Sequence, residues 1–193
     1  MNQDPKRLLV SALIGAVLVA AAVLVAFTGG DDEATTAVTT APRSLTTAAG
    51  PPPGSGPDAP EITFEYFDGT EATLATYEGQ PLVVNFWASW CPSCVAEMSA
   101  AFRPAQQRLG DEVAFLGLNL QDRRAEAERL AEETGVLFDL AEDPNGVFYS
   151  EFGGFAMPYT VFISGHGEIV HEHNGPLTED QLVDLIDEHL LSA

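Results

Sequence analysis

Residues 82–109 contain, in order, an apolar run, two closely spaced cysteines and a helical pattern of apolar residues. The run at 82–87 reads LVVNFW, which is typical of a strand buried on both faces of a sheet. After Cys91 the apolar residues recur at spacings of three and four, which predicts an amphipathic helix: Val95, Met98, Phe102, Ala105 and Leu109. Pro104 is expected to kink this helix, because its ring removes a backbone donor. A buried strand that leads directly into such a helix indicates the α/β class.

The rest of the chain from about residue 60 alternates between strand and helix patterns. Two hairpins are predicted, one around 62–66 with an Asp68-Gly69 turn and one formed by 159–164 and 168–173. A second buried strand is predicted at 113–120, and a charged helix at 123–134 that ends at Gly135. A last helix starts at Thr178, with Gln181 completing a capping box. This order predicts a mixed sheet with helices on both faces.

Cys91 and Cys94 are the two cysteines of the chain, and their spacing favours redox chemistry over structural cross-linking. A bridge across two residues closes too small a loop to stabilise the fold much. Pro92 suits the first position of a helix, so Cys91 is expected at the helix N-terminus. Free N–H groups and the helix dipole stabilise an anion there, and should lower the pKa of the Cys91 thiol. Cys94, one turn further on, is placed to resolve a mixed disulfide.

A metal site is the competing interpretation of this cysteine pair. The two cysteines would supply only two of the four ligands of a structural zinc site, and the chain has no second cysteine pair. The histidines all lie in the last 30 residues, and His171 with His173 would share one face of a strand. Such residues are more often a solvated strand face, and no metal is expected.

The chain is strongly acidic, with a formal net charge of −21. Nucleic-acid binding requires clustered cations that displace counterions from phosphates. The charge therefore excludes nucleic acid as an expected partner.

Residues 8–27 form an uncharged apolar run that is long enough to cross a bilayer. Lys6 and Arg7 precede it and acidic residues follow it, which predicts a cytoplasmic N-terminus at 1–7 and an extracytoplasmic remainder. A cleaved signal peptide is the alternative, although no clear Ala-x-Ala site follows the run. Residues 28–59 are rich in Ala, Thr, Pro and Gly, and predict a flexible linker. The folded domain is expected at 60–193, on a single-pass protein of the cell membrane.

Three segments carry a resemblance to a known family. The segment NFWASWCPSC at 85–94 looks like the active-site segment of thioredoxin-fold proteins. FGGFAMPYTVFI at 152–163 resembles the segment that carries the cis-proline of that fold, and GHGEIV at 165–170 resembles the turn and strand that follow it. The extra N-terminal hairpin, the inserted region and the predicted anchor point to the TlpA/ResA type of extracytoplasmic redoxin. The resemblance covers about residues 60–191.

This resemblance implies a thioredoxin fold and a protein thiol–disulfide oxidoreductase, with Cys91 as nucleophile and Cys94 as resolving residue. It implies a cis peptide bond at Pro158 and a substrate groove lined by four residues: Trp90, Pro92, Met157 and Pro158. Glu97 stands where the family type often has an acidic residue, and if buried it would shuttle the proton of Cys94. The plainer interpretation of Glu97 is an exposed helix glutamate.

No separate cofactor is expected, because the disulfide is itself the redox group. The implied partners are protein thiols or disulfides and a membrane electron donor or acceptor. The single predicted anchor and the acidic surface make a monomer the default expectation. Apocytochrome maturation, oxidative folding and repair all stay open. A copper-delivery protein is the alternative, although copper carriers of this fold usually space their cysteines one residue wider. A peroxidase is a third option, but WCPSC does not resemble a peroxiredoxin loop.

Three positions depart from the family pattern. Asn85 replaces the buried aspartate of thioredoxin, so that proton route is absent. Ser99 stands where many TlpA-type proteins have proline, and Met157 precedes the predicted cis-proline, where it would tune the reduction potential.

Overall fold

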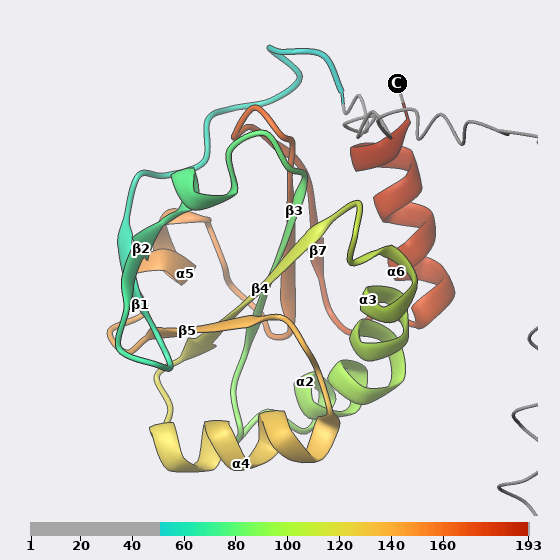
Figure 1. The fold of residues 1–193 in the computed structure, drawn as a ribbon. Helices are drawn as coiled ribbons and strands as arrows, with labels where there is room; N and C mark the ends of the chain where they lie inside the picture. The colour runs from blue at the N-terminus through green and yellow to red at the C-terminus, as the bar shows by residue number, and fades with distance from the viewer. Residues whose placement is uncertain (1–50, 193) are drawn as a thin grey trace, which may run out of the picture. The chain divides into compact units, whose positions relative to one another are not determined.

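The computed structural model describes residues 51–192, which form one seven-stranded sheet with helices on both of its faces (Figure 1). The spatial order of the strands is β2-β1-β5-β4-β3-β6-β7. The strands are β1 (Thr63–Tyr66), β2 (Glu71–Thr73), β3 (Leu82–Trp87), β4 (Ala114–Leu120), β5 (Asp139–Asp143), β6 (Tyr159–Ile163) and β7 (Ile169–Asn174). The α-helices are α2 (Pro92–Glu97), α3 (Arg103–Leu109), α4 (Arg124–Thr134), α5 (Val147–Glu151) and α6 (Glu179–Ile186). Both predicted hairpins and the mixed direction of the sheet are confirmed.

The centre of the sheet consists of β3 flanked by β4 and β6. β3 pairs with β4 in parallel and with β6 in the antiparallel direction, and all six of its residues are buried. Phe86 lies opposite Tyr159 in this register, so the end of β3 meets the start of β6. The segment after β3 and the segment before β6 therefore emerge at the same edge of the sheet. This edge carries the cysteines.

Two hydrophobic clusters lie on opposite faces of the sheet. One packs α2, α3, α4 and α6 against side chains such as Val83, Phe115 and Phe162. The other packs α5 and the β1–β2 hairpin against Val84, Leu116 and their neighbours. Alternation along β3 and β4 sends successive residues to opposite faces, which is why the sequence of both strands is apolar almost throughout.

The helical region after the cysteines changes geometry before Pro104. A π-helical segment, Met98–Phe102, joins α2 to α3, and Pro104 lies in the first turn of α3. Proline has no N–H to donate to the carbonyl four residues earlier, so the wider turn accommodates the missing bond. The disturbance predicted for Pro104 therefore takes the form of a π segment on its N-terminal side.

Two elements between β4 and the second hairpin were not predicted. β5 reads DLAED, an acidic stretch with weak strand character, and it pairs with β1 and β4. α5 has only five residues, too short to produce a helical period in the sequence.

The predicted linker at 28–59 differs from the structure at its C-terminal end. The Glu168 carboxylate accepts hydrogen bonds from the backbone N–H groups of Gly54 (2.6 Å) and Ser55 (3.1 Å). Ala59 donates to the carbonyl of Gly167 at 2.8 Å. Residues 54–59 thus belong to the folded domain, because the turn between β6 and β7 satisfies their backbone. The remainder of the predicted linker before residue 51, and the predicted anchor at 8–27, lie outside the described residues.

Within residues 51–192, every helix is too short or too polar to span a bilayer.

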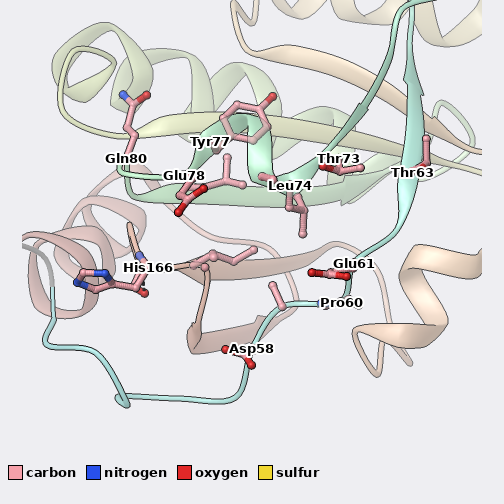
Figure 2. A pocket seen from close by; sticks show the side chains of 16 residues that line it. Asp58, Pro60, Glu61, Thr63, Thr73, Leu74, Tyr77, Glu78, Gln80 and His166 are labelled. Atoms are coloured by element: carbon pink, nitrogen blue, oxygen red, sulfur yellow. Dashed lines mark hydrogen bonds between the residues drawn. The ribbon is translucent and has the colours of Figure 1, made fainter.

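A pocket of about 680 Å³ opens between the first hairpin and the β6–β7 turn (Figure 2). Leu82 at the start of β3 and Ile163 at the end of β6 line it. These are the strand ends opposite to the edge that carries the cysteines, so the pocket is separate from the cysteine site.

Candidate active site

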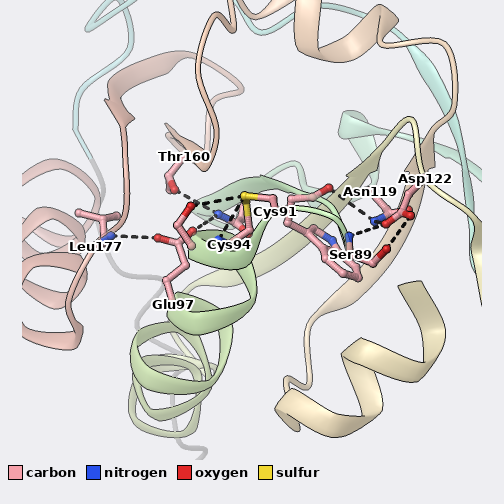
Figure 3. Close-up of a disulfide and its surroundings, with 11 residues drawn as sticks. Ser89, Cys91, Cys94, Glu97, Asn119, Asp122, Thr160 and Leu177 are labelled. Atoms are coloured by element: carbon pink, nitrogen blue, oxygen red, sulfur yellow. Dashed lines mark hydrogen bonds between the residues drawn. A yellow bond between two sulfur atoms is a disulfide. The ribbon is translucent and has the colours of Figure 1, made fainter. Parts of the chain in front are cut away.

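Cys91 and Cys94 form a disulfide at the start of α2 (Figure 3). Cys91 is the N-cap residue, and its sulfur accepts a hydrogen bond from the backbone N–H of Cys94 at 3.3 Å. Pro92 follows in the first turn, as predicted. An N–H group aimed at sulfur and the positive end of the helix dipole both favour a Cys91 thiolate once the disulfide is reduced.

The two sulfurs differ in accessibility. Cys91 is 6% exposed, whereas Cys94 is fully buried at 0%. The hydroxyl of Ser93 lies 3.5 Å from the Cys91 sulfur, so a second hydrogen-bonding group reaches the outer cysteine alone. An incoming thiol or disulfide therefore meets Cys91 first, and Cys94 can act only from within the protein.

Glu97 lies one helical turn beyond Cys94 and is 3% exposed, so it is not an exposed helix glutamate. Its carboxyl accepts from the backbone N–H of Leu177 at 2.9 Å and from the side-chain amide of Asn85 at 3.0 Å. Burial raises the pKa of Glu97 to about 7, although both hydrogen bonds act to lower it. Residues three apart on a helix are neighbours on one face, so Glu97 is a titratable group placed beside Cys94.

Asn85 and Thr160 complete a buried polar group beneath the cysteines. The amide nitrogen of Asn85 also donates to the Thr160 hydroxyl at 3.3 Å, while its amide oxygen is buried without a partner. A protonated Glu97 would need an acceptor, and a half-turn of the Asn85 amide would supply its free oxygen. This arrangement can accommodate either protonation state of Glu97.

The Met157–Pro158 peptide bond is cis, as predicted. Pro158 is buried at the start of β6, and Met157 is half-buried. The Pro158 carbonyl accepts from Gly175 at 2.9 Å, two residues before the Leu177 amide that binds Glu97. The cis-proline segment and the loop before α6 are thereby fixed at the same edge of the sheet as the cysteines.

The two tryptophans take different positions. Trp87 is fully buried, whereas Trp90 is 57% exposed and its indole N–H donates to the carbonyl of Gln121 at 3.3 Å. Pro92 is also exposed, next to Cys91. Trp90 and Pro92 therefore flank the outer cysteine with apolar surface that a substrate can contact.

Asp122 also belongs to this site and was not predicted from the sequence. One of its oxygens accepts from the backbone N–H of Ser89 and from Asn119 at 3.2 Å. The other accepts from the Ser89 hydroxyl and from the Arg123 backbone, both at 2.7 Å. Burial acts to raise the pKa of Asp122, but these hydrogen bonds outweigh it and hold that pKa below its usual range. The available signal was its position directly after a buried parallel strand, where functional side chains gather.

Metal ligands do not converge in the described part of the chain. No group of three or more His, Cys, Asp or Glu side chains within residues 51–192 is arranged to hold a metal ion. His171 and His189 stack on each other with ring centroids 4.2 Å apart, between β7 and the C-terminal helical segment.

Comparison with known proteins agrees with this geometry. A family model described as Redoxin matches residues 54–186. A thiol:disulfide interchange protein DsbE homologue of Paracoccus denitrificans is 36% identical over 128 residues, which cover 65% of this chain and 69% of that protein. The thiol-disulfide oxidoreductase ResA of Halalkalibacterium halodurans is 28% identical over 138 residues, covering 69% of this chain and 76% of ResA.

A solved structure supports the fold. A DsbF homologue from Corynebacterium diphtheriae superposes with a TM-score of 0.63 at 22% identity, covering 76% of this chain and 95% of that chain. The predicted thioredoxin-like α/β fold is confirmed for the described residues.

Proposed function

This chain belongs to the redoxin family, and on that premise we propose that it exchanges the Cys91–Cys94 disulfide with thiols of other proteins. The activity is that of a protein thiol–disulfide oxidoreductase, the class to which its relatives are assigned by name. The assignment of roles to the two cysteines is supported by their difference in position and exposure. Cys91 caps the helix and keeps 6% of its surface exposed, whereas Cys94 is fully buried.

Reduction of a substrate proceeds in two displacements. The Cys91 thiolate attacks one sulfur of a substrate disulfide, forming a Cys91–substrate disulfide and releasing one substrate thiolate. The Cys94 thiolate then attacks the Cys91 sulfur, which forms the internal disulfide and releases the second substrate thiolate. Two electrons pass from the cysteine pair to the substrate. With a substrate dithiol and the oxidised protein, the same steps run in reverse.

Glu97 is proposed to take the proton of Cys94 before the second displacement. A carboxyl with a pKa of about 7 is half ionised near neutral pH, so it can accept and return a proton without a large energy difference. Asn85 holds the ionised carboxylate in place by its amide N–H. Trp90, Pro92, Met157 and Pro158 are proposed to line the surface on which the substrate segment lies.

The cellular setting is proposed from the sequence. Residues 8–27 would anchor the protein in the cell membrane and residues 28–50 would connect the anchor to the domain, with that domain outside the cytoplasm. Apocytochrome maturation, oxidative folding and repair are the three pathway types that this setting allows, with a membrane protein as electron donor or acceptor. Fractionation of cells expressing the full chain, followed by protease digestion of intact spheroplasts, tests anchoring and orientation together.

Trapping of the mixed disulfide tests the exchange reaction. Cys94→Ser should accumulate disulfide-linked complexes through Cys91, because the second displacement has lost its nucleophile. Cys91→Ser, which leaves the same number of thiols, is the matched control and should trap none. Equal trapping by both variants would contradict the assignment of the two roles.

The direction of electron flow depends on the reduction potential of the pair. Equilibration of the full chain against glutathione or dithiothreitol buffers gives this potential. A value near or below roughly −250 mV indicates a reductant, and a value near roughly −120 mV indicates an oxidant. A pair that forms no reversible disulfide would contradict the proposal and favour the copper-delivery alternative.

A further inference from the structure

The segment that presents Cys91 is bound from one side by the loop after β4. Residues 88–91 form a tight turn, closed by a hydrogen bond from the Cys91 N–H to the Ala88 carbonyl at 3.1 Å. The loop at 121–123 contacts this turn through Asp122, which accepts from both the backbone N–H and the hydroxyl of Ser89 (Figure 3). The same loop accepts from the indole of Trp90 through the Gln121 carbonyl.

Asp122 is the residue on which these contacts converge. Its two oxygens accept four hydrogen bonds, and none of the ion pairs found within residues 51–192 includes it. Two of the four donors belong to Ser89, two residues before Cys91. Each oxygen must face its donors, because a hydrogen bond weakens steeply as its angle departs from linear. Asp122 therefore fixes the position of Ser89 rather than merely neutralising a charge.

Gln121, whose carbonyl accepts from Trp90, has an unusual backbone conformation. Its φ angle is +46°, and it is the one residue other than glycine with a positive φ in the described part of the chain. Residues other than glycine are strained in this left-handed region of the backbone angles, and they remain there where surrounding contacts hold them. Here the Gln121 N–H donates to the backbone carbonyl of Asp143 at 3.1 Å, while the Gln121 carbonyl accepts from the Trp90 indole.

We propose that Asp122 is a positioning residue that holds Cys91 ready to form the disulfide with Cys94. The proposal rests on the proposed exchange function. In the oxidised protein the covalent bond fixes the Cys91 sulfur. In the dithiol that bond is absent, and the outer sulfur is restrained by the Cys94 N–H, by the Ser93 hydroxyl and by the turn at 88–91 with its anchor on Asp122.

This restraint has a thermodynamic consequence. A dithiol whose sulfurs are held close together loses less conformational entropy when it forms a disulfide, so its effective concentration is higher. Asp122 should therefore favour the oxidised form of the protein and make the dithiol a stronger reductant. Loss of Asp122 should have the opposite effect, because the freed turn gains entropy only in the reduced state.

The test measures the exchange equilibrium of the full-length chain with glutathione. Asp122→Ala should lower the constant for disulfide formation about tenfold, which corresponds to a rise of about 30 mV in the reduction potential. Asp111→Asn is the matched control, since Asp111 is an exposed carboxylate before β4, at the opposite end of that strand, and should leave the constant unchanged. Ser89→Ala, which removes one donor and keeps the Asp122 charge, should shift the constant in the same direction by a smaller factor.

The competing explanations give different results. If Asp122 only stabilised the fold, Asp122→Ala would lower the melting temperature of oxidised and reduced protein equally and would leave the equilibrium constant unchanged. If Asp122 acted only through its charge, Asp122→Asn and Asp122→Ala would shift the constant equally, and both would lower the pKa of the Cys91 thiol because a nearby negative charge is removed. Ser89→Ala would then have no effect. Either result overturns the proposal. If Asp122→Ala does not fold, the Ser89→Ala result decides alone. A wild-type protein that forms no reversible disulfide would instead contradict the exchange function.

Discussion

The amide nitrogen of Asn85 lies 3.0 Å from a carboxyl oxygen of Glu97, and both side chains are buried beneath the cysteine pair. Asn85 comes from the central strand β3 and Glu97 from the helix that begins at the cysteines. An amide donates a hydrogen bond but does not titrate, so Glu97 is the acid of this pair. The contact explains how a carboxyl with a raised pKa stays in a defined position in its ionised form.

Replacement of Glu97 by Gln should remove part of the pH dependence of stability. The folded-state pKa of about 7 lies above the unfolded value of roughly 4.3, so between these pH values the folded protein binds more protons than the unfolded chain. Stability should therefore fall as pH rises through this window, by on the order of 4 kcal/mol in total. Urea unfolding of oxidised wild type and Glu97→Gln at pH 4.5 and pH 8 measures the difference.

The control for this experiment is Glu151→Gln, which changes an exposed glutamate of α5. Glu151→Gln should keep the wild-type slope, whereas Glu97→Gln should lose the falling component. Identical slopes for all three proteins would show that Glu97 titrates as an ordinary surface carboxyl.

Replacement of Asn85 by Asp should produce a pair of coupled carboxyls. Two carboxylates about 3 Å apart repel each other, so one of them should remain protonated well above neutral pH. We expect two separated titration steps, one below and one above the wild-type value of about 7, in carbon-13 NMR spectra of labelled side chains. Asn85→Ser, which introduces no second acid, should show a single step. A single step in Asn85→Asp would refute the proposed proximity of the two groups in solution.

The local part of the active site was predictable from the sequence. The strand at 82–87, the cysteines and the following helix are contiguous, so their periodicities place Cys91 at a helix start. Glu97 could be named because the family resemblance implies an acidic residue one helical turn beyond Cys94. Its burial was not predictable, because that depends on the Leu177 amide, which is 80 residues away in the sequence.

The missed features depend on contacts between distant segments. Asp122 contacts a turn 33 residues earlier; its position after a buried strand marks it as a candidate, but no local pattern identifies that turn as its partner. β5 has an acidic sequence that alone does not favour a strand, and it is a strand because β1 and β4 provide partners on both sides. Tertiary pairing outweighed intrinsic preference at this position.

Replacement of Gly117 by Ala should destabilise the domain. A Cβ atom at this position of β4 would lie 2.5 Å from a ring carbon of Phe138 and 3.0 Å from the indole nitrogen of Trp87. Both neighbours are buried large side chains, so the added methyl group should reduce the free energy of unfolding by about 1–3 kcal/mol. Denaturant unfolding measures the change. Gly165→Ala is the matched control, because its nearest contact would be 3.4 Å.

Replacement of His171 by Phe should make the domain less sensitive to acid. His171 stacks on His189, and burial together with the charges of His189 and His173 lowers its pKa, against the opposing effect of Glu188 and Glu172. The unfolded chain, with a histidine pKa of about 6.5, therefore takes up this proton first as the pH falls. The stability contributed by neutral His171 is present above that pH and is lost as the pH falls through the lower folded value.

The effect on His171 has the opposite sign to that of Glu97, so it is best measured as a difference between proteins. His171→Phe keeps an aromatic ring against His189 and cannot be protonated. Its melting temperature should fall less than that of wild type between pH 7 and pH 5. The same substitution at His166, an exposed residue of the β6–β7 turn, should keep the wild-type loss. If His171→Phe and wild type lose the same number of degrees, the stacked pair does not hold His171 in its neutral form.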